Sequence, residues 1–346
     1  MKVALISPLP PPSGGIASWT LDYIEYEKKR DIETYVINTA LVGKRAVHRT
    51  KSKNLLCEIK RSYYIVKELR KVIRSKEVDI VHINTVCSTF GMIRDIICLT
   101  NCRRIPIVVQ CHCNVEDWIG KSEVSLLLFK VILYMADRVI VLNKKSQDFI
   151  KNKVKKESVC IPNFIKCVYE KEHSINKEVR QVVYVGQVRK KKGIEEIISV
   201  AKDMPHITFN LIGPIEEEIK KCQKSDNVVL RGEILHENIA EELEKADVFL
   251  FPSYTEGFSM ALLEAMNIGL PVIATDVGAN SDMIENKGGI LVSSQNSQQI
   301  VEAINALNPE SIRERMSNWN QQKVKKYYTI DKVMKRLDDI YKELLA

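Results

Sequence analysis

Short apolar runs rich in β-branched residues alternate with longer amphipathic stretches along the whole chain. The short runs are continuously hydrophobic, which is typical of parallel strands that helices cover on both faces. We expect strands at residues 2–7, 34–38, 79–84, 105–112, 138–142 and 158–161, and then at 181–188, 207–212, 228–231, 248–252, 272–275 and 289–292. The stretches between them, such as 55–74 and 122–136, have helical spacing of apolar residues. This pattern predicts an α/β protein with two doubly wound parallel sheets.

The alternation is interrupted once, where charged residues crowd the stretch 164–179. We interpret this stretch as a linker between a Rossmann-like domain at 1–163 and a second one at 180–325. A length of 346 residues fits two domains of ordinary size. Because open α/β sheets bind ligands at the carboxyl ends of their strands, two such sheets that face each other predict a central cleft. The last stretch, to residue 346, looks purely helical.

Composition narrows the class of protein. Hydrophobic residues make up 45% and charged residues 28%, and no apolar run approaches the ~20 residues of a membrane span. The first residues lack the pattern of a signal peptide, so we expect a cytoplasmic protein. Nine cysteines without a secretory signal do not suggest a disulfide framework. In Cys111-His112-Cys113 the histidine of a strand points away from both thiols, so we expect no metal there.

Positive charge is concentrated in the first half. Residues 1–163 hold 28 Lys and Arg against 16 Asp and Glu, whereas the remainder holds 24 against 28. Residues 43–76 alone hold twelve basic and two acidic residues. This asymmetry suggests an anionic partner: a membrane surface, nucleic acid or a phosphorylated substrate. Nucleic acid is disfavoured because no known nucleic-acid module accompanies the charge.

The stretch 44–76 also interleaves apolar and aromatic residues with its cations. Such a surface suits anionic lipid headgroups or a lipid pyrophosphate, so we expect contact with an anionic membrane. A solvated basic helix is the alternative. The apolar members are Leu55, Leu56, Ile59, Tyr63, Tyr64, Ile65 and Val66.

Two loops carry the residue types that bind phosphate. Gly14 and Gly15 follow the first strand and would let backbone N–H groups approach an anion at a helix start. Residues 186–193 follow the first strand of the second domain and bring Arg189 and Lys192 to a strand-to-helix turn. A turn without a ligand and a solvated charged face are the respective alternatives. Neither loop has the spacing of a dinucleotide fingerprint or a P-loop.

A third loop combines carboxylates with a helix start. We expect a strand to end at Pro252 and a helix to begin near Phe258, with Glu256 just before it and Glu264 two turns along it. Carboxylates accept hydrogen bonds from diols such as ribose or sugar hydroxyls. Structural salt bridges are the alternative. The N–H groups expected to face the ligand are those of Gly257, Phe258, Ser259 and Met260.

These residues carry a resemblance that covers nearly the whole chain. Glu256-x7-Glu264 followed by 269–276 and Gly278 resembles the signature of the retaining glycosyltransferases of family 4, the group 1 glycosyltransferases, which have the GT-B fold. This motif is specific. Weaker matches are the Gly14-Gly15 loop, 136–142, 161–163 and Lys192-Gly193.

The resemblance implies a role for each matching residue. Glu264 would hold the ribose of the donor nucleotide, and Glu256 would contact the donor sugar near its reacting centre. Lys192 would neutralise the departing pyrophosphate, and His112 would touch the donor sugar from the first domain. Such enzymes usually have Arg where this chain has Gln187, and we expect Arg189 to supply that charge.

The resemblance also implies the architecture and the reaction. The C-terminal helix, 326–346, would pack back onto the first domain. The protein would transfer a sugar from a nucleoside-diphosphate sugar to a saccharide acceptor, expected to be lipid-linked, in bacterial surface-polysaccharide synthesis. The chain has no Asp-x-Asp pair, so no metal or other cofactor is expected. A nucleotide-sugar epimerase and a catalytically silent binding subunit are the alternative functions.

Overall fold

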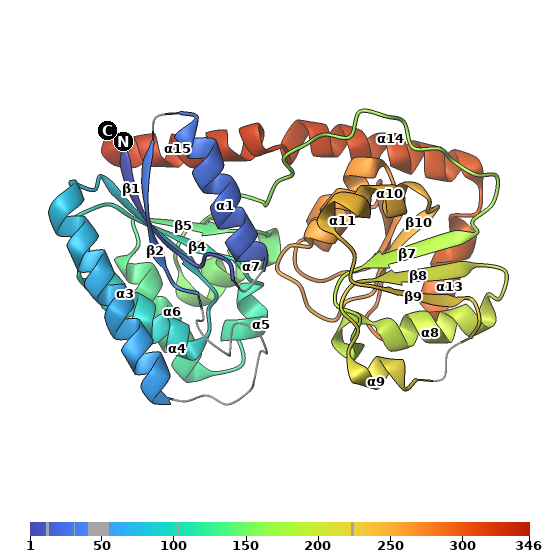
Figure 1. Ribbon diagram of the computed structural model, residues 1–346, viewed down its shortest axis with the longest axis horizontal. Coiled ribbons are helices and arrows are strands. Elements are labelled where there is room, and N and C mark those ends of the chain that lie inside the picture. The colour runs from blue at the N-terminus through green and yellow to red at the C-terminus, as the bar shows by residue number, and fades with distance from the viewer. Residues whose placement is uncertain (12–13, 31, 41–54, 103, 223–224) are drawn as a thin grey trace. The chain divides into compact units, whose positions relative to one another are not determined.

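The computed structural model describes residues 1–11, 14–30, 32–40, 55–102, 104–222 and 225–346, and of Leu55 it describes the backbone alone. The chain forms two compact units, each built on one open sheet (Figure 1). Unit 1 contains Met1–Asn163 and Met334–Ala346, and unit 2 contains Phe164–Val333. No helix in the described ranges is both long and apolar enough to cross a membrane.

The sheet of unit 1 has six parallel strands in the order β2-β1-β3-β4-β5-β6. Every strand that the hydrophobic pattern predicts in this half is present, with ends shifted by at most two residues. The central strands are buried along their whole length, as strands covered on both faces must be. Their bounds are β1 (Lys2–Ser7), β2 (Glu33–Asn38), β3 (Ile80–Thr85), β4 (Ile107–Cys111), β5 (Arg138–Val141) and β6 (Val159–Cys160).

Helices cover both faces of this sheet. In Figure 1, α1 (Gly15–Lys28) and α15 (Ile330–Leu345) lie on one face, and α3 (Leu55–Lys76), α4 (Thr89–Thr100) and α6 (Glu123–Met135) lie on the other. Serine caps mark two of the helix starts, since Ser88 and Ser122 each accept a bond from the backbone N–H three residues on. The short helices are α5 (Val115–Ile119), α7 (Lys144–Phe149) and η1 (Ile150–Val154).

The sheet of unit 2 also has six parallel strands, in the order β12-β11-β10-β7-β8-β9. The first strand of this unit, β7, therefore lies between its second, β8, and its fourth, β10, which is the doubly wound order of dinucleotide-binding sheets. The bounds are β7 (Gln181–Val185), β8 (Thr208–Ile212), β9 (Val228–Gly232), β10 (Val248–Phe251), β11 (Val272–Thr275) and β12 (Gly289–Val292).

Two helix layers enclose this second sheet (Figure 1). Helices α8 (Ile194–Asp203) and α13 (Ser297–Ala306) pack together on one face. On the other face α11 (Met260–Ile268) packs against α10 (Ile239–Glu244) and α14 (Glu310–Tyr327). The remaining helices are η2 (Lys190–Lys192), α9 (Glu217–Lys220), η3 (His236–Asn238) and α12 (Asn280–Ile284).

The C-terminal stretch, which the sequence predicts to be purely helical, is two helices with a break between them. Helix α14 ends at Tyr327, and the chain then forms a parallel bridge in which Thr329 pairs with Ile165. Ile165 donates to the carbonyl of Tyr328 at 2.9 Å and accepts from Ile330 at 3.0 Å, so these backbone groups are used outside a helix. The last helix therefore begins at Ile330, not at residue 326. From Met334 onward it belongs to unit 1.

The stretch interpreted as a linker is packed on unit 2. It has no helix or strand, but Phe164, His173 and Val179 are buried. The amide oxygen of Asn267 accepts from the backbone of Tyr169 at 3.1 Å, which helps to hold the stretch in place.

Candidate functional site

The chemistry-bearing loops of unit 2 meet at one point of its sheet. β7 and β10 are neighbours, but the chain leaves β7 toward β8 and leaves β10 toward β11 on the opposite side. The helices that follow these two strands, α8 and α11, therefore lie on opposite faces of the sheet, and the carboxyl ends of β7 and β10 form the switch point, the crevice in which doubly wound sheets bind ligands. The loops that follow these two strands carry Lys192 and Glu256.

Two glycines allow close contacts between the loops at this edge of the sheet. Gly193 has φ +75°, and a Cβ there would lie 2.2 Å from the carbonyl oxygen of Pro252. Gly278 has φ +53°, and a Cβ there would lie 2.2 Å from the carbonyl oxygen of Glu256. Both positions therefore require glycine, for backbone conformation and for space. The backbone N–H of Tyr254 also donates to the carbonyl of Lys191 at 3.1 Å, which joins the two loops directly.

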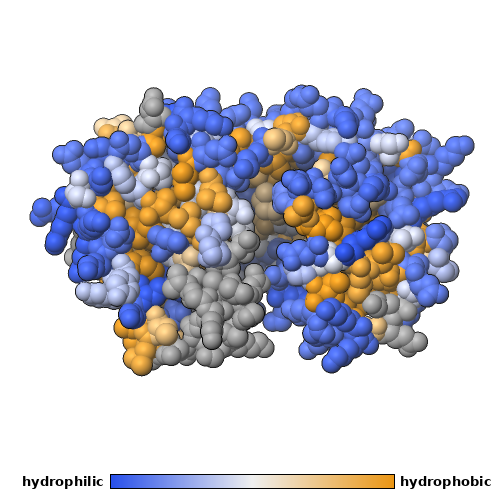
Figure 2. Space-filling model, in the orientation of Figure 1, coloured by the Kyte–Doolittle hydropathy of each residue, from blue (hydrophilic) through white to orange (hydrophobic). Residues whose placement is uncertain are grey.

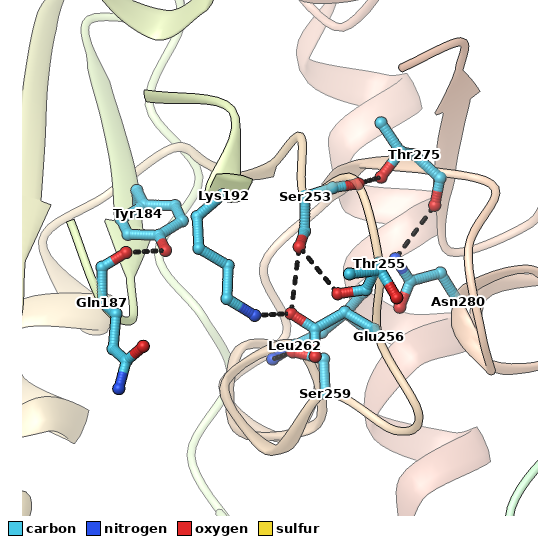
Figure 3. Close-up of polar contacts among 10 residues, drawn as sticks. All are labelled: Tyr184, Gln187, Lys192, Ser253, Thr255, Glu256, Ser259, Leu262, Thr275 and Asn280. Atoms are coloured by element: carbon cyan, nitrogen blue, oxygen red, sulfur yellow. Dashed lines mark hydrogen bonds and ion pairs between the residues drawn. The ribbon is translucent and has the colours of Figure 1, made fainter. Parts of the chain in front are cut away.

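Lys192 and Glu256 form an ion pair in this crevice (Figure 3). Their side chains are only 17% and 14% exposed. The hydroxyl of Ser253 donates to the same carboxylate oxygen, Oε1, at 3.1 Å. The ammonium group also lies 5.8 Å from the centre of the Phe251 ring. The structure thus brings together the cation and the carboxylate that the sequence predicts for the pyrophosphate and the donor sugar.

The side chains of Thr275 and Asn280 hold the backbone beside the carboxylate loop (Figure 3). The hydroxyl of Thr275 donates to the carbonyl of Ser253, and the side-chain amide of Asn280 donates to the carbonyl of Thr275 at 2.9 Å. Thr275 and Asn280 are fully buried. These bonds fix the backbone of Ser253, three residues before Glu256.

The second glutamate lies on the helix that follows. Helix α11 begins at Met260 and not near Phe258, because Ser259 is its cap and accepts from the backbone of Leu262 at 3.2 Å. Glu264 therefore lies one turn into the helix, not two. Its carboxylate is 22% exposed and lies 3.1 Å from Nε2 of His236, a residue that the sequence reasoning did not single out.

The helix start at Met260 also changes the place of Gly257 and Phe258. They precede the helix, and the carbonyl of Gly257 accepts from Ala279 at 3.2 Å. The ring of Phe258 is buried and lies 6.0 Å from that of Tyr328. Neither residue belongs to the first helical turn, so the N–H groups of that turn begin at Met260.

Arg189 also lies in this region of unit 2. Its Nε is buried and has no hydrogen-bond partner among the residues that the structure describes. Tyr184 donates from its hydroxyl to the carbonyl of Gln187 at 2.9 Å. Burial and the charge of Glu256 raise the pKa of Tyr184, and the nearby Arg189 opposes this rise. Arg189 thus brings an incompletely satisfied positive charge to the Gln187 loop.

In unit 1 the Gly14-Gly15 loop leaves open space around its two glycines, at the start of α1. Helix α1 begins at Gly15, and Gly14 is its cap. A Cβ at either glycine would meet no atom within 4 Å. The protein's own packing therefore does not require glycine at these two positions.

His112 follows β4 at the carboxyl edge of the unit 1 sheet. Its neighbours Cys111 and Cys113 are buried, whereas His112 is half-buried. Its Nε2 lies 3.0 Å from Oδ1 of Asn84, and its ring makes an edge contact with Trp19 at 5.3 Å between centroids. Burial, with a smaller effect of a second histidine, lowers the pKa of His112 to about 3. The imidazole is therefore neutral at physiological pH.

Several residues of these sites carry no motif of their own. Ser253, His236 and Asn84 contact the predicted residues, yet no spacing rule identifies them. Ser253 could be identified in part from the sequence, because it follows the apolar run of β10 and lies three residues before Glu256. Position at the end of a strand is the signal that could have identified it.

Two family models together match residues 13–325. The model described as Glycosyltransferase Family 4 matches residues 13–168, and the model described as Glycosyl transferases group 1 matches residues 168–325. The chain belongs to the group 1 glycosyltransferases. The resemblance that the paired glutamates suggested is therefore confirmed.

Two solved structures show the same fold. Sucrose-phosphate synthase from Thermosynechococcus elongatus is 19% identical with a TM-score of 0.80, over 99% of this chain and 98% of that one. HepE from Anabaena, solved in complex with UDP-glucose, is 16% identical with a TM-score of 0.74, over 99% and 100% of the two chains. The two six-stranded parallel sheets are those of the GT-B fold, as expected.

A curated relative has a name that refers to polysaccharide synthesis. The capsular polysaccharide biosynthesis glycosyltransferase CapM of Staphylococcus aureus is 23% identical over 356 residues, which span 93% of each chain.

Proposed function

We propose that this glycosyltransferase moves a sugar, with retention of anomeric configuration, from a nucleoside-diphosphate sugar to a saccharide acceptor in the synthesis of a bacterial surface polysaccharide. The observation that carries the proposal is the Lys192–Glu256 pair at the switch point of the unit 2 sheet, with Glu264 on the helix that follows. A cation and two carboxylates in one crevice suit a ligand that combines phosphates with sugar hydroxyls.

Each group of unit 2 has a part in donor binding. Glu264 accepts hydrogen bonds from the ribose hydroxyls, and Glu256 contacts the donor sugar near its anomeric carbon. Lys192, Arg189 and the backbone N–H groups from Ser259 and Met260 face the pyrophosphate. In unit 1, the Gly14-Gly15 loop and His112 contact the sugar of the donor.

Charge stabilisation is the main catalytic task. When the anomeric C–O bond breaks, positive charge develops on the sugar ring and negative charge on the departing diphosphate. Fixed cations and N–H groups aimed at the diphosphate lower the free energy of that state. The acceptor oxygen bonds to the anomeric carbon on the face that the diphosphate leaves, and the departing phosphate oxygen takes the acceptor proton. We propose that this arrangement needs no divalent cation.

The acceptor is proposed to be lipid-linked, with unit 1 on an anionic membrane at its cytoplasmic face. Residues 44–54 of the basic stretch lie outside the described residues. In α3, which completes the stretch, Ile65 and Val66 are buried in the core, whereas Leu56, Ile59 and Tyr63 are exposed among seven basic and two acidic residues. Apolar side chains reach the surface over the lower end of this helix in Figure 2.

The neighbouring helices extend this apolar surface. On α4 and α6, which pack against each other, seven large hydrophobic side chains are exposed, and Tyr134 is 89% exposed. A soluble monomer rarely exposes so many on adjacent helices without a function. The exposed residues are Phe90, Ile93, Ile97, Val124, Leu127, Val131 and Tyr134. Beside them, an apolar groove of about 460 Å³ is lined by Ile96, Thr100, Lys130, Val131, Tyr134 and Met135.

A donor panel tests the proposal. Purified protein is mixed with UDP-, GDP-, ADP- and dTDP-sugars, and binding is followed by the shift in melting temperature. Release of nucleoside diphosphate is then measured with a membrane extract as the source of acceptor and with EDTA present. We expect one donor to stabilise the protein and to release diphosphate, and we expect Glu256→Gln to abolish release.

Three outcomes would contradict the proposal. Stabilisation without release would indicate a silent binding subunit. Conversion of the free nucleotide sugar without net release of diphosphate would indicate an epimerase. The absence of binding by any donor would show that the crevice of unit 2 is not a nucleotide site. Release that stops on addition of EDTA would refute only the metal-independent mechanism.

A further inference from the structure

A continuous chain of buried side-chain hydrogen bonds connects His112 to the first turn of α1. Nε2 of His112 lies 3.0 Å from Oδ1 of Asn84, and Nδ2 of Asn84 lies 2.9 Å from the hydroxyl of Ser7. That hydroxyl lies 2.6 Å from the hydroxyl of Thr20, which in turn lies 2.8 Å from the carbonyl oxygen of Ile16. Ser7, Thr20 and Asn84 are at most 2% exposed, so water does not take part in their bonds.

The direction of every bond in this chain follows from its last member. A backbone carbonyl can only accept, so Thr20 donates its single hydroxyl proton to Ile16. The bond between Thr20 and Ser7 must then use the proton of Ser7. Because Ser7 has only one proton, it can only accept from Asn84, so the NH2 group of Asn84 faces Ser7 and its carbonyl oxygen faces His112.

We infer that Asn84, Ser7 and Thr20 are positioning residues that hold His112 as the tautomer with its proton on Nε2. The amide oxygen of Asn84 can only accept, so Nε2 must donate to it. A neutral imidazole has one proton, and Nδ1 is then an unprotonated acceptor. Among the residues that the structure describes, Nδ1 has no hydrogen-bond partner, and it is not one of the buried unpartnered atoms.

This tautomer limits what His112 can do, and the limit rests on the role proposed for His112 above. An acceptor at Nδ1 recognises a hydroxyl that donates, such as a hydroxyl of the donor sugar. It cannot donate to a phosphate oxygen or protonate a leaving group. The low pKa of His112 agrees with this reading, since the ring does not gain a second proton near neutral pH. The ring also makes an edge contact with Trp19.

A second histidine of this unit, the buried His82, lacks the anchor that fixes the tautomer of His112. Nδ1 of His82 lies 2.5 Å from the hydroxyl of Tyr341, and that hydroxyl lies 3.2 Å from the hydroxyl of Tyr23. Neither tyrosine is bonded to a backbone carbonyl in this chain of contacts, so no group fixes the direction of these bonds. The carbonyl anchor at Ile16 is what distinguishes the His112 chain.

Nuclear magnetic resonance of the whole protein, labelled with 15N-histidine, tests the tautomer directly. We expect the His112 ring to show a protonated Nε2 and an unprotonated Nδ1 at neutral pH, with the signal assigned by its loss in His112→Gln. A protonated Nδ1 in the unmodified protein would overturn the inference, whatever the variants do.

Thr20 offers a matched pair of variants. Thr20→Val keeps the shape but removes the hydroxyl that receives the proton of Ser7, whereas Thr20→Ser keeps the hydroxyl. We expect Thr20→Val to mix the two tautomers and to lower kcat roughly 2- to 10-fold, the usual effect of one neutral hydrogen bond, with KM for the donor nearly unchanged. Thr20→Ser should restore both readouts.

The result separates this inference from the proposed function. If both variants kept a single Nε2–H tautomer and equal kcat, the positioning role would be refuted while sugar transfer stood. If the protein transferred no sugar, the proposed function would fail, yet the tautomer of His112 would still be read from the spectrum. Should Thr20→Val not fold, Ser7→Ala removes the same link and is measured in its place.

Discussion

Glu256→Gln is expected to tighten the binding of a nucleoside diphosphate while it abolishes transfer. In the free protein Glu256 neutralises Lys192, the cation proposed for the pyrophosphate. An incoming diphosphate must therefore compete with the carboxylate for Lys192, and it is also repelled by the carboxylate. Glutamine keeps the shape and still accepts from Ser253 but removes the negative charge.

The size of the effect follows from Coulomb's law. Two unit charges ~6 Å apart at an effective dielectric constant of ~40–80 repel by roughly 0.7–1.4 kcal/mol. Removing this repulsion should tighten binding about 3- to 10-fold. Lys192→Met has the opposite effect. A charge-assisted hydrogen bond contributes roughly 1.5–3 kcal/mol, and because Lys192 exchanges one anionic partner for another, we expect the lower end, a loss of about 10-fold.

Isothermal titration calorimetry at fixed ionic strength measures both changes, with the nucleoside diphosphate of the best donor. Lys190→Met is the matched control, because Lys190 lies in the same loop but is 59% exposed and pairs with Glu195 at 2.8 Å. In a Lys192→Met background, Glu256→Gln should tighten diphosphate binding less than it does in the wild-type protein. The carboxylate then has no lysine to release. Weaker diphosphate binding by Glu256→Gln, or equal losses in the two lysine variants, would refute the reasoning.

Three further predictions concern other parts of the molecule. Arg189→Ala should weaken diphosphate binding about ten- to a hundredfold by calorimetry, and unchanged affinity would remove Arg189 from the site. Burial, with a smaller effect of the charge on Asp338, raises the pKa of Glu27 from 4.5 to about 7, so the stability that the neutral carboxyl contributes is lost as the pH rises from about 4.5 to 7. Glu27→Gln should therefore raise the free energy of unfolding in urea by up to about 3 kcal/mol at pH 8.5 and by little at pH 4.5, and an equal gain at both pH values would contradict this. Binding to phosphatidylglycerol vesicles should fall in 0.5 M salt and in the double variant Leu127→Ser, Tyr134→Ser, but not in Leu21→Ser, the control on α1. Unchanged binding by the double variant would exclude the α4–α6 surface, and unchanged binding in salt would exclude electrostatic attraction.

Periodicity predicted every strand of both sheets because the strands are buried on both faces and read as unbroken apolar runs. The donor loops could be placed for the same reason, since a residue directly after such a run lies at the binding edge of the sheet. The predicted start of α11 near Phe258 is two residues early. Phe258 is apolar and buried like a helical residue, yet the hydroxyl of Ser259 caps the helix. The break between α14 and α15 depends on Ile165, which lies far away in the sequence and leaves no local signal.

The contacts that tune each site are harder to predict, because they depend on side-chain direction rather than on residue type. The sequence places His112 at the end of a strand, but its proton is assigned by a carbonyl in α1, through three side chains that carry no motif. Likewise, Lys192 and Glu256 are predicted as separate contacts to different parts of one ligand, and their pairing with each other appears only in the folded protein. That pairing has a consequence for binding. A diphosphate that takes Lys192 also releases Glu256, so the carboxylate becomes available to the sugar only when the nucleotide has bound.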